Sequence, residues 1–162
     1  MQEGKILAAH HNGAYVIRLV GDVRLTLCTT IDEYFQGMFD DPDFASVWVD
    51  LCDAEGIDST TLGLLAKVSI RARERFGYRP VIISTNESIT RLITSMGFDI
   101  VFDIRTEAIA GDDDLRALAA TASSEEGVRA RVIAAHRVLM GLNEDNRAKF
   151  QELVTTLENV SN

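Results

Sequence analysis

Residues 47–65 read VWVDLCDAEGIDSTTLGLL. The run from Val47 to Leu51 is rich in β-forming apolar residues without clean alternation, which is typical of a central strand covered on both faces. We expect this strand to stop at Cys52-Asp53. Beyond the next loop, apolar residues return at helical spacing, so the stretch predicts a strand, a loop and a helix. This is the repeating unit of an α/β fold.

The predicted start of this helix gathers a carboxylate and three hydroxyl groups, on Asp58, Ser59, Thr60 and Thr61. One interpretation is capping, because Asp, Ser and Thr side chains satisfy the free N–H groups of a first helical turn. The other is that one hydroxyl is a modification site, at which an added phosphate switches a function. The motif alone leaves both interpretations open.

The segments around this unit continue the α/β pattern. Asn12-Gly13 between two apolar runs predicts a β-hairpin, whose second strand we expect to break at Gly21-Asp22. The other predicted elements are helices at 26–39, 59–76 and 86–96 and strands at 80–84 and 98–104, with Asn86 or Ser88 capping the third helix. These elements predict an α/β fold in which helices pack on a mixed sheet.

The composition shifts after Arg105, where Ala, Ser and Asp become frequent and strand patterns end. Residues 115–120 are expected to close the first domain with a helix. Two amphipathic helices follow, joined by the turn GLNEDN at 141–146, which predicts a C-terminal helical hairpin. We therefore divide the chain into a domain at 1–120 and a C-terminal helical extension at 121–162.

The extension is expected to pack as a hairpin through its apolar stripes, formed by Val132, Leu139, Phe150, Leu153 and Leu157. Neither helix is expected to be stable alone in water, so the hairpin must cover the α/β domain, a second copy of the chain in a homodimer, or a partner. The short connection favours the α/β domain.

Composition narrows the function classes. The 162 residues are 46% hydrophobic and 25% charged, a globular balance, and the net charge of −9 disfavours nucleic acid as a partner. The apolar runs fall short of the ~20 residues that cross a bilayer, and the first residues do not resemble a secretory signal. Cys28 and Cys52 are scattered thiols, so we expect a cytoplasmic protein that neither spans nor binds a membrane.

Enzymatic motifs are missing from the sequence. It contains neither common nucleotide-binding loop and no H-E-x-x-H pattern, and the adjacent His10 and His11 would diverge on a strand. No G-x-S-x-G elbow surrounds Ser59, and His136 on the apolar stripe is interpreted as an ordinary interfacial histidine. We therefore expect no enzyme, no metal site and no cofactor.

The order of the elements and the motif together resemble the STAS domain family, and within it the anti-sigma factor antagonists. The resemblance covers residues 5–120. Its most specific part is residues 47–65, because the family places an apolar strand ending in Asp-Leu before Asp-Ser-[Ser/Thr]-Gly-Leu-Gly at a helix start. Residues 79–104, RPVIISTNESITRLITSMGFDIVFDI, resemble the later strand, Asn-containing loop, short helix and last strand.

The resemblance implies a bacterial partner switch without catalysis of its own. Ser59 would be the phosphoacceptor, Thr60 a candidate second acceptor, and Asp58 a residue that holds the loop and contacts the partner. The partners would be an anti-sigma factor, which can itself be the serine kinase, and a serine phosphatase. Thr61 departs from the family, which usually has Gly or Ala there. The partner surface would comprise Asp58, Ser59, Thr60, Thr61, Leu62 and Asn86.

Two other functions stay open. One is a STAS scaffold or transporter-accessory module that is never phosphorylated. The other is a sensor of a small ligand, for which the sequence offers no convergent polar set.

Overall fold

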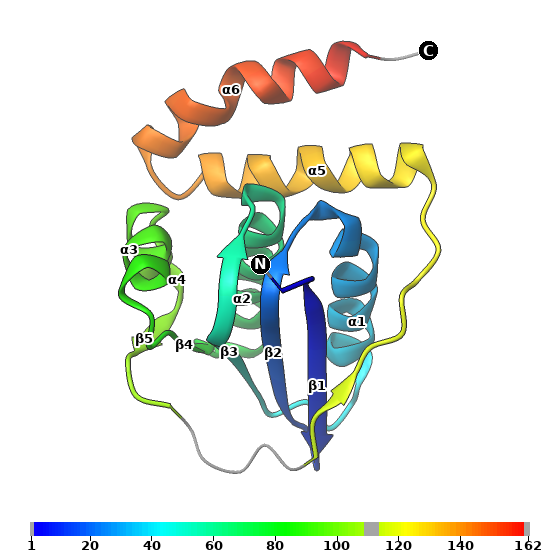
Figure 1. The fold of residues 1–162 in the computed structure, drawn as a ribbon, viewed down its shortest axis with the longest axis vertical. Coiled ribbons are helices and arrows are strands. Elements are labelled where there is room, and N and C mark those ends of the chain that lie inside the picture. The colour runs from blue at the N-terminus through cyan, green and yellow to red at the C-terminus, as the bar shows by residue number, and fades with distance from the viewer. Residues whose placement is uncertain (1, 109–113, 161–162) are drawn as a thin grey trace.

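The protein is built around a mixed β-sheet. In a computed structural model, which describes residues 2–108 and 114–160, the strands form a 6-stranded sheet in the order β5-β4-β3-β2-β1-β6 (Figure 1). Strands β2 to β5 are parallel to one another, and β1 is antiparallel to both β2 and β6. The strands are β1 (Lys5–His11), β2 (Ala14–Val23), β3 (Ser46–Ile57), β4 (Val81–Ile83), β5 (Asp103–Arg105) and β6 (Arg116–Ala117).

Helices follow the strands as the α/β pattern predicts. The helices are α1 (Cys28–Asp40), α2 (Ser59–Phe76), α3 (Glu87–Ser95), α4 (Phe98–Val101), α5 (Glu125–Met140) and α6 (Glu144–Asn159), with a 3-10 turn, η1 (Leu25–Leu27), before α1. Gly77 ends α2 in the left-handed conformation, at φ 64°, a backbone region that glycine enters without steric cost.

The predicted N-terminal hairpin is confirmed. β1 and β2 pair antiparallel with His11 opposite Ala14, which leaves Asn12 and Gly13 as the turn. Both turn residues have positive φ, 50° and 86°, as a two-residue hairpin of matching twist requires.

Two expected strand ends were wrong. β2 continues past Gly21-Asp22 to Val23, and β3 continues past Cys52-Asp53 to Ile57. The parallel register of the two strands shifts between Gly21 and Asp22, where Gly21 has φ 75°. Gly21 and Asp22 thus lie at a bulge in the strand pair and not at a strand end, because a bulge bends a strand without ending it.

Two other elements differ from expectation. Of the strand predicted at 98–104, the first four residues form α4, and Asp103 and Ile104 are the two that belong to β5. The helix predicted at 115–120 is absent: Arg116–Ala117 form β6, which pairs with Leu7 and Ala8 of β1. Both segments are short, and their composition fits either state.

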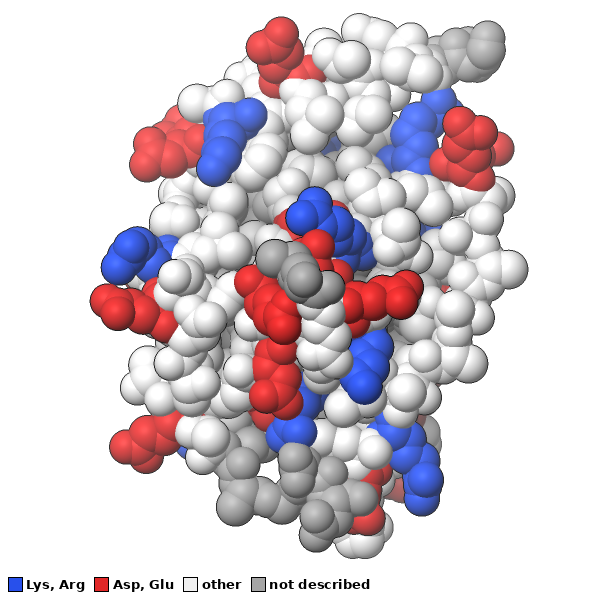
Figure 2. All heavy atoms as spheres, viewed as in Figure 1, with Lys and Arg blue, Asp and Glu red and all other residues white. Residues whose placement is uncertain are grey.

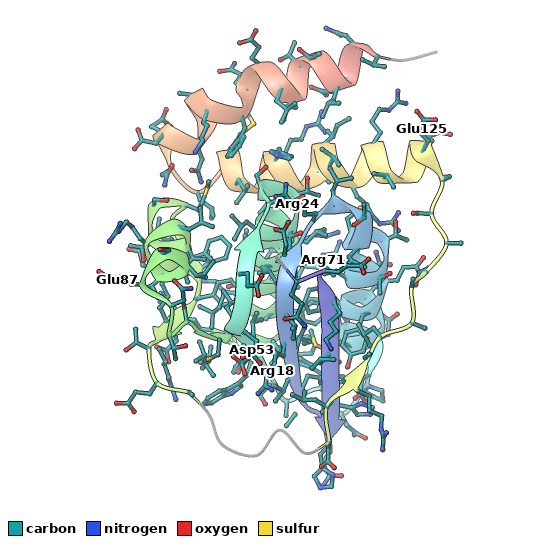
Figure 3. The ribbon with its side chains drawn as sticks, in the orientation of Figure 1. Arg18, Arg24, Asp53, Arg71, Glu87 and Glu125 are labelled. Atoms are coloured by element: carbon teal, nitrogen blue, oxygen red, sulfur yellow. The ribbon has the colours of Figure 1, made fainter. Side chains whose placement is uncertain are left out.

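The sheet has one deeply buried face. Alternate residues of β2 and β3 point into the core and are almost fully buried, namely Ile17, Leu19, Val47, Val49 and Leu51. On the opposite face Trp48 and Cys52 are only half-buried, and the Arg18 guanidinium pairs with the Asp50 carboxylate at 2.9 Å. Figure 3 shows Arg18 and Asp53 together in front of the sheet. The expected burial of β3 on both faces is therefore found only in part.

Charge on that face is mixed. Figure 2 shows acidic and basic side chains next to one another over the middle of the sheet. Arg24 pairs with Asp22 there at 2.7 Å, and the Arg18 guanidinium lies 3.8 Å from the Asp53 carboxylate. A phosphate backbone binds an extended basic surface, and this face does not offer one.

The C-terminal extension forms the predicted helical hairpin. Figure 1 shows α5 crossing one end of the α/β domain over the start of α2, with α6 beyond it. The two helices α5 and α2 approach so closely at Gly63 that an added Cβ would lie 2.3 Å from the carbonyl oxygen of Ala135. Leu139 and Phe150 are buried as expected, whereas Leu153 is 41% exposed, so its predicted packing role was wrong.

Polar contacts hold the hairpin as well. The buried Asp32 carboxylate of α1 accepts from Arg131 of α5 at 2.9 Å and from Lys67 of α2 at 3.1 Å. The Asn146 side-chain amide donates to the Met96 carbonyl at 2.8 Å and to the Leu139 carbonyl at 2.9 Å. These contacts tie the first turn of α6 and the middle of α5 to the α/β domain.

Candidate functional site

The start of α2 is fixed by Asp58. Its backbone is extended, and its carboxylate accepts from the N–H of Thr61 at 2.9 Å, so it caps the helix. The same carboxylate accepts from the N–H of Leu25 at 2.7 Å. Asp58 therefore performs the capping that the motif predicted, and it also joins the start of α2 to η1.

The three hydroxyls that follow differ in exposure. Ser59 is half-exposed, whereas Thr60 and Thr61 are only 3% and 0% exposed. The hydroxyl of Thr61 has no hydrogen-bond partner among the described residues. Of the two predicted phosphoacceptors, Ser59 is the one within reach of another protein in this conformation, and Thr60 would require the first turn of α2 to open.

The unpaired hydroxyl of Thr61 gives a stability prediction. A buried polar group without a partner costs about 1–3 kcal/mol, and valine has nearly the same shape and helix propensity. We expect Thr61→Val to raise the free energy of unfolding by about 1 kcal/mol, measured by urea titration. A loss of stability would mean that the hydroxyl is satisfied in solution.

A histidine from the C-terminal extension contacts Ser59. The Ser59 Oγ lies 2.8 Å from His136 Nε2, and His136 Nδ1 lies 2.7 Å from the carbonyl oxygen of Val132. A carbonyl oxygen only accepts, so the neutral ring carries its hydrogen on Nδ1 and leaves Nε2 to accept from the Ser59 hydroxyl. His136 is 2% exposed, and its ring packs edge-on against Phe150 with centroids 5.0 Å apart.

Sequence reasoning placed His136 at an interface but did not pair it with Ser59. The two residues are separated by 77 positions, so no local pattern connects them. The sequence did contain one indication. His136 lies on the apolar stripe of its helix and is therefore buried when that helix packs on the domain, and buried polar groups nearly always have a hydrogen-bond partner.

Ser59 opens into a groove between α2 and the hairpin. The groove has a volume of about 1020 Å³. Asp58, Ser59 and Thr60 form one wall, and Leu25 extends it. The opposite walls belong to α5 and α6 and are formed by Glu125, Glu126, Val128, Arg129, Val132, His136, Leu153, Leu157 and Val160. Leu25 and Leu153 are each 41% exposed, so the groove combines an apolar lining with a polar end at Ser59.

The structure does not bring all predicted partner residues together. Asp58, Ser59 and Thr60 line the groove, but Leu62 and Thr61 are buried beneath it. Asn86 is exposed at the start of α3, where its side-chain oxygen accepts from the N–H of Ser88 at 2.8 Å. It is thus the cap of α3 that the sequence predicted.

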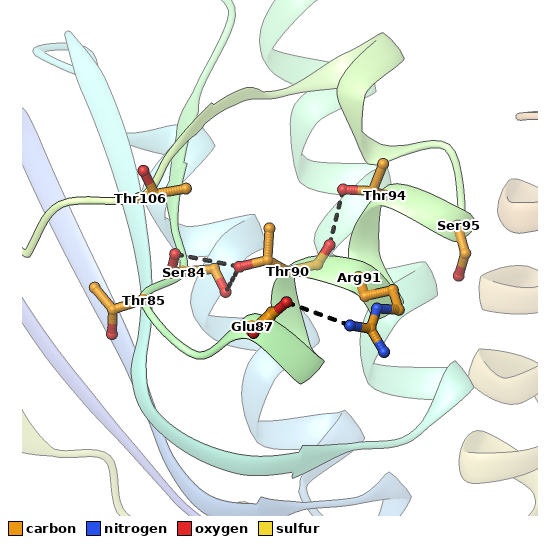
Figure 4. Close-up of a pocket in the computed structure, with 8 residues that line it drawn as sticks. All are labelled: Ser84, Thr85, Glu87, Thr90, Arg91, Thr94, Ser95 and Thr106. Carbon is orange, nitrogen blue, oxygen red and sulfur yellow. Dashed lines mark hydrogen bonds and ion pairs between the residues drawn. The ribbon is translucent and has the colours of Figure 1, made fainter.

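A second hollow lies beside α3. Its volume is about 590 Å³, and hydroxyl-bearing residues dominate its wall (Figure 4). The hydroxyls of Ser84 and Thr90 are 2.7 Å apart and satisfy each other, and Glu87 pairs with Arg91 at 3.4 Å. These four side chains are therefore paired with one another, and we take the groove at Ser59 as the candidate site.

Several chemistries lack support in the described residues. Within 2–108 and 114–160, no group of three or more His, Cys, Asp or Glu side chains is arranged to hold a metal ion. Burial raises the pKa of both the Cys28 and the Cys52 thiol, so neither is a reactive thiolate near neutral pH. Among the described helices, none has both the length and the apolar character of a membrane-spanning segment.

The architecture defines a class of fold: a STAS-like mixed sheet with packed helices. No protein-family model matches the sequence, and no curated protein does. Among solved structures, the chain is similar to the crystal structure of an anti-sigma factor antagonist from Mycobacterium paratuberculosis. The TM-score is 0.54 at 19% sequence identity, and the match covers 65% of this chain and 87% of that one. The resemblance seen in the sequence is thus confirmed for the fold.

Proposed function

We propose that the protein is a bacterial anti-sigma factor antagonist, a partner-switching regulator that reversible phosphorylation of Ser59 controls. One observation carries the proposal: Ser59 is the half-exposed hydroxyl of the capped α2 start, and it opens into the groove. The similarity of the fold to an anti-sigma factor antagonist agrees with this assignment.

The site has the physical properties of a charge switch. A phosphate on Ser59 would add about −1.5 to −2 charges. The N-terminus of α2 favours negative charge, so the fold should tolerate the modification. Asp58, Glu125 and Glu126 line the same groove and outnumber the basic Arg129, so the added charge makes an already acidic surface more acidic. An acidic partner surface that binds the unmodified groove would then be repelled, at a cost of several kcal/mol.

The partners follow from the proposal. An anti-sigma factor would bind the unphosphorylated form, a serine kinase, either the same protein or another, would modify Ser59, and a serine phosphatase would restore it. All of these act in the cytoplasm. The protein itself is a substrate and a binder and carries out no turnover. The alternative, a STAS scaffold or transporter-accessory module without phosphorylation, predicts that the charge on Ser59 has no consequence.

Affinity capture with two variants separates these functions. Ser59→Ala should keep the partner bound, and Ser59→Asp should weaken binding about tenfold or more, measured by calorimetry with the captured partner. Ser88→Asp is the matched control, because it adds the same charge to the first turn of α3, away from the groove.

The stability of the variants must be checked alongside. The helix N-terminus offsets the loss of one hydrogen bond, so Ser59→Asp should change the free energy of unfolding by only ~1 kcal/mol. Equal partner affinity for Ser59→Ala and Ser59→Asp, in variants that melt like the parent, would contradict the switch and favour the scaffold.

A further inference from the structure

The contact between Ser59 and His136 has the geometry of a nucleophile and its base. The Oγ–Nε2 distance of 2.8 Å is within hydrogen-bond reach, and the Val132 carbonyl orients the ring from the other side at 2.7 Å. A hydroxyl nucleophile is activated in this way: an adjacent base accepts its proton, and a third group holds the base in the correct tautomer. Asp58 already caps α2, so capping does not account for this contact.

We propose that His136 is the general base that activates Ser59, so that the protein brings its own base to the phosphoryl transfer. This inference rests on the proposed function, in which Ser59 is the acceptor. It assigns His136, from the C-terminal extension, a catalytic role in the modification of the α/β domain.

The chemical step can be written with each bond accounted for. The Ser59 Oγ attacks the terminal phosphorus of a nucleoside triphosphate that the kinase supplies, and a new O–P bond forms. The bond from that phosphorus to the bridging oxygen breaks, and the nucleoside diphosphate leaves with the electron pair. The Oγ proton passes to His136 Nε2, since Nδ1 already holds a hydrogen.

The surroundings fit this step. The groove gives an approach to Ser59, while the base is 2% exposed, so bulk water does not compete for Nε2. The N-terminus of α2 carries the positive end of the helix dipole, which favours the negative charge of an incoming phosphate. The protonated imidazole then lies beside the new phosphate, where opposite charges attract.

The inference also explains why the hairpin is docked at this place. The base reaches Ser59 only while α5 crosses α2 at the Gly63–Ala135 contact. A kinase would therefore act on the intact protein with the hairpin in place, and loss of docking would slow the modification even if Ser59 became more exposed.

An alkyl fluorophosphonate probe tests the reactivity of Ser59 without any kinase. The serine oxygen attacks phosphorus, fluoride leaves, and the proton goes to His136. The full chain is incubated with the probe, and labelled serines are quantified by peptide mass mapping. Ser88 serves as the internal reference, because it is an exposed serine in the first turn of α3. We expect Ser59 to label at least about 100-fold faster than Ser88.

Variants then assign the effect to the base. His136→Gln offers a hydrogen-bond acceptor but cannot take the proton, and it should lower the Ser59 labelling rate about 100-fold. His136→Ala should show the same loss, and added imidazole should restore part of the rate. Ser59 labelling no faster than Ser88, or His136→Gln labelling like the parent, would overturn the inference. The first comparison needs no variant, so it decides even if His136→Gln fails to fold.

The outcome is distinguishable from failure of the proposed function. Suppose that Ser59 is phosphorylated in cells but does not react with the probe. The role of His136 as general base would then be rejected, and the phosphorylation switch would stand. Suppose instead that Ser59 reacts with the probe in a His136-dependent way but is never phosphorylated in cells. The activation of Ser59 by His136 would then stand, and the phosphorylation switch would be rejected.

Discussion

Replacing Gly63 with alanine should destabilise the protein, although alanine is the better helix former. The added methyl group would lie 2.3 Å from the carbonyl oxygen of Ala135, which belongs to the backbone of α5. A backbone atom in a packed helix cannot rotate away, so α5 has to move. Such overpacking costs typically about 1–3 kcal/mol, and we expect a loss of that size in urea titration.

Gly37→Ala is the matched control. Gly37 also lies within a helix, α1, but its added methyl group would meet no atom within 4 Å. Here the helix propensity acts alone, and stability should rise by up to about 1 kcal/mol. The two substitutions therefore have opposite expected signs. A Gly63→Ala variant as stable as Gly37→Ala would contradict the close crossing of α2 and α5.

Ending the chain at Ser124 should have the larger effect. The cut removes Ala135, Leu139 and Phe150 from the core, and it leaves the buried Asp32 carboxylate without Arg131. Losing one large core side chain costs about 2–5 kcal/mol, and a shift of this size lowers the melting temperature of such a domain by roughly 10 °C. Scanning calorimetry and dye binding to exposed apolar surface measure both consequences.

The result also distinguishes the possible roles of the extension. If the hairpin served a homodimer or a partner, truncation would leave the melting temperature unchanged and abolish association instead. An unchanged melting temperature in a protein that is monomeric at full length would refute docking onto the α/β domain.

The sequence predicts those features that depend on neighbouring residues. The Asp58 cap at the start of α2, the Asn12-Gly13 turn and the Asn86 cap all follow from local rules, because caps and turns select residue types at fixed offsets. The STAS-like order of the elements could therefore be read from one chain.

Features that depend on distant contacts could not be read in this way. β6 exists because Arg116 and Ala117 pair with β1 across more than a hundred residues. The continuation of β3 to Ile57 depends on its pairing with Val23 of β2. Polar residues at Cys52-Asp53 suggested an end where the partner strand in fact continues.

The candidate site shows the same division. Ser59 and Asp58 could be identified from their own motif. His136 belongs to α5, 77 positions further along the chain, so the motif carries no information about it. The sequence also could not predict which of the three hydroxyls is exposed, because the burial of Thr60 and Thr61 depends on the packing of α2. Asn86 was assigned to the partner surface through a resemblance, and its geometry is that of a cap.

Phosphate mapping on the protein isolated from its native cells tests the central proposal most directly. The parent chain and Ser59→Ala are purified in parallel, and their peptides spanning residues 58–62 are compared by mass spectrometry. The switch predicts a phosphate on Ser59 that disappears in Ser59→Ala without moving to Thr60. Phosphate confined to Thr60, or an unmodified Ser59 under every growth condition in which the partner is bound and released, would contradict it.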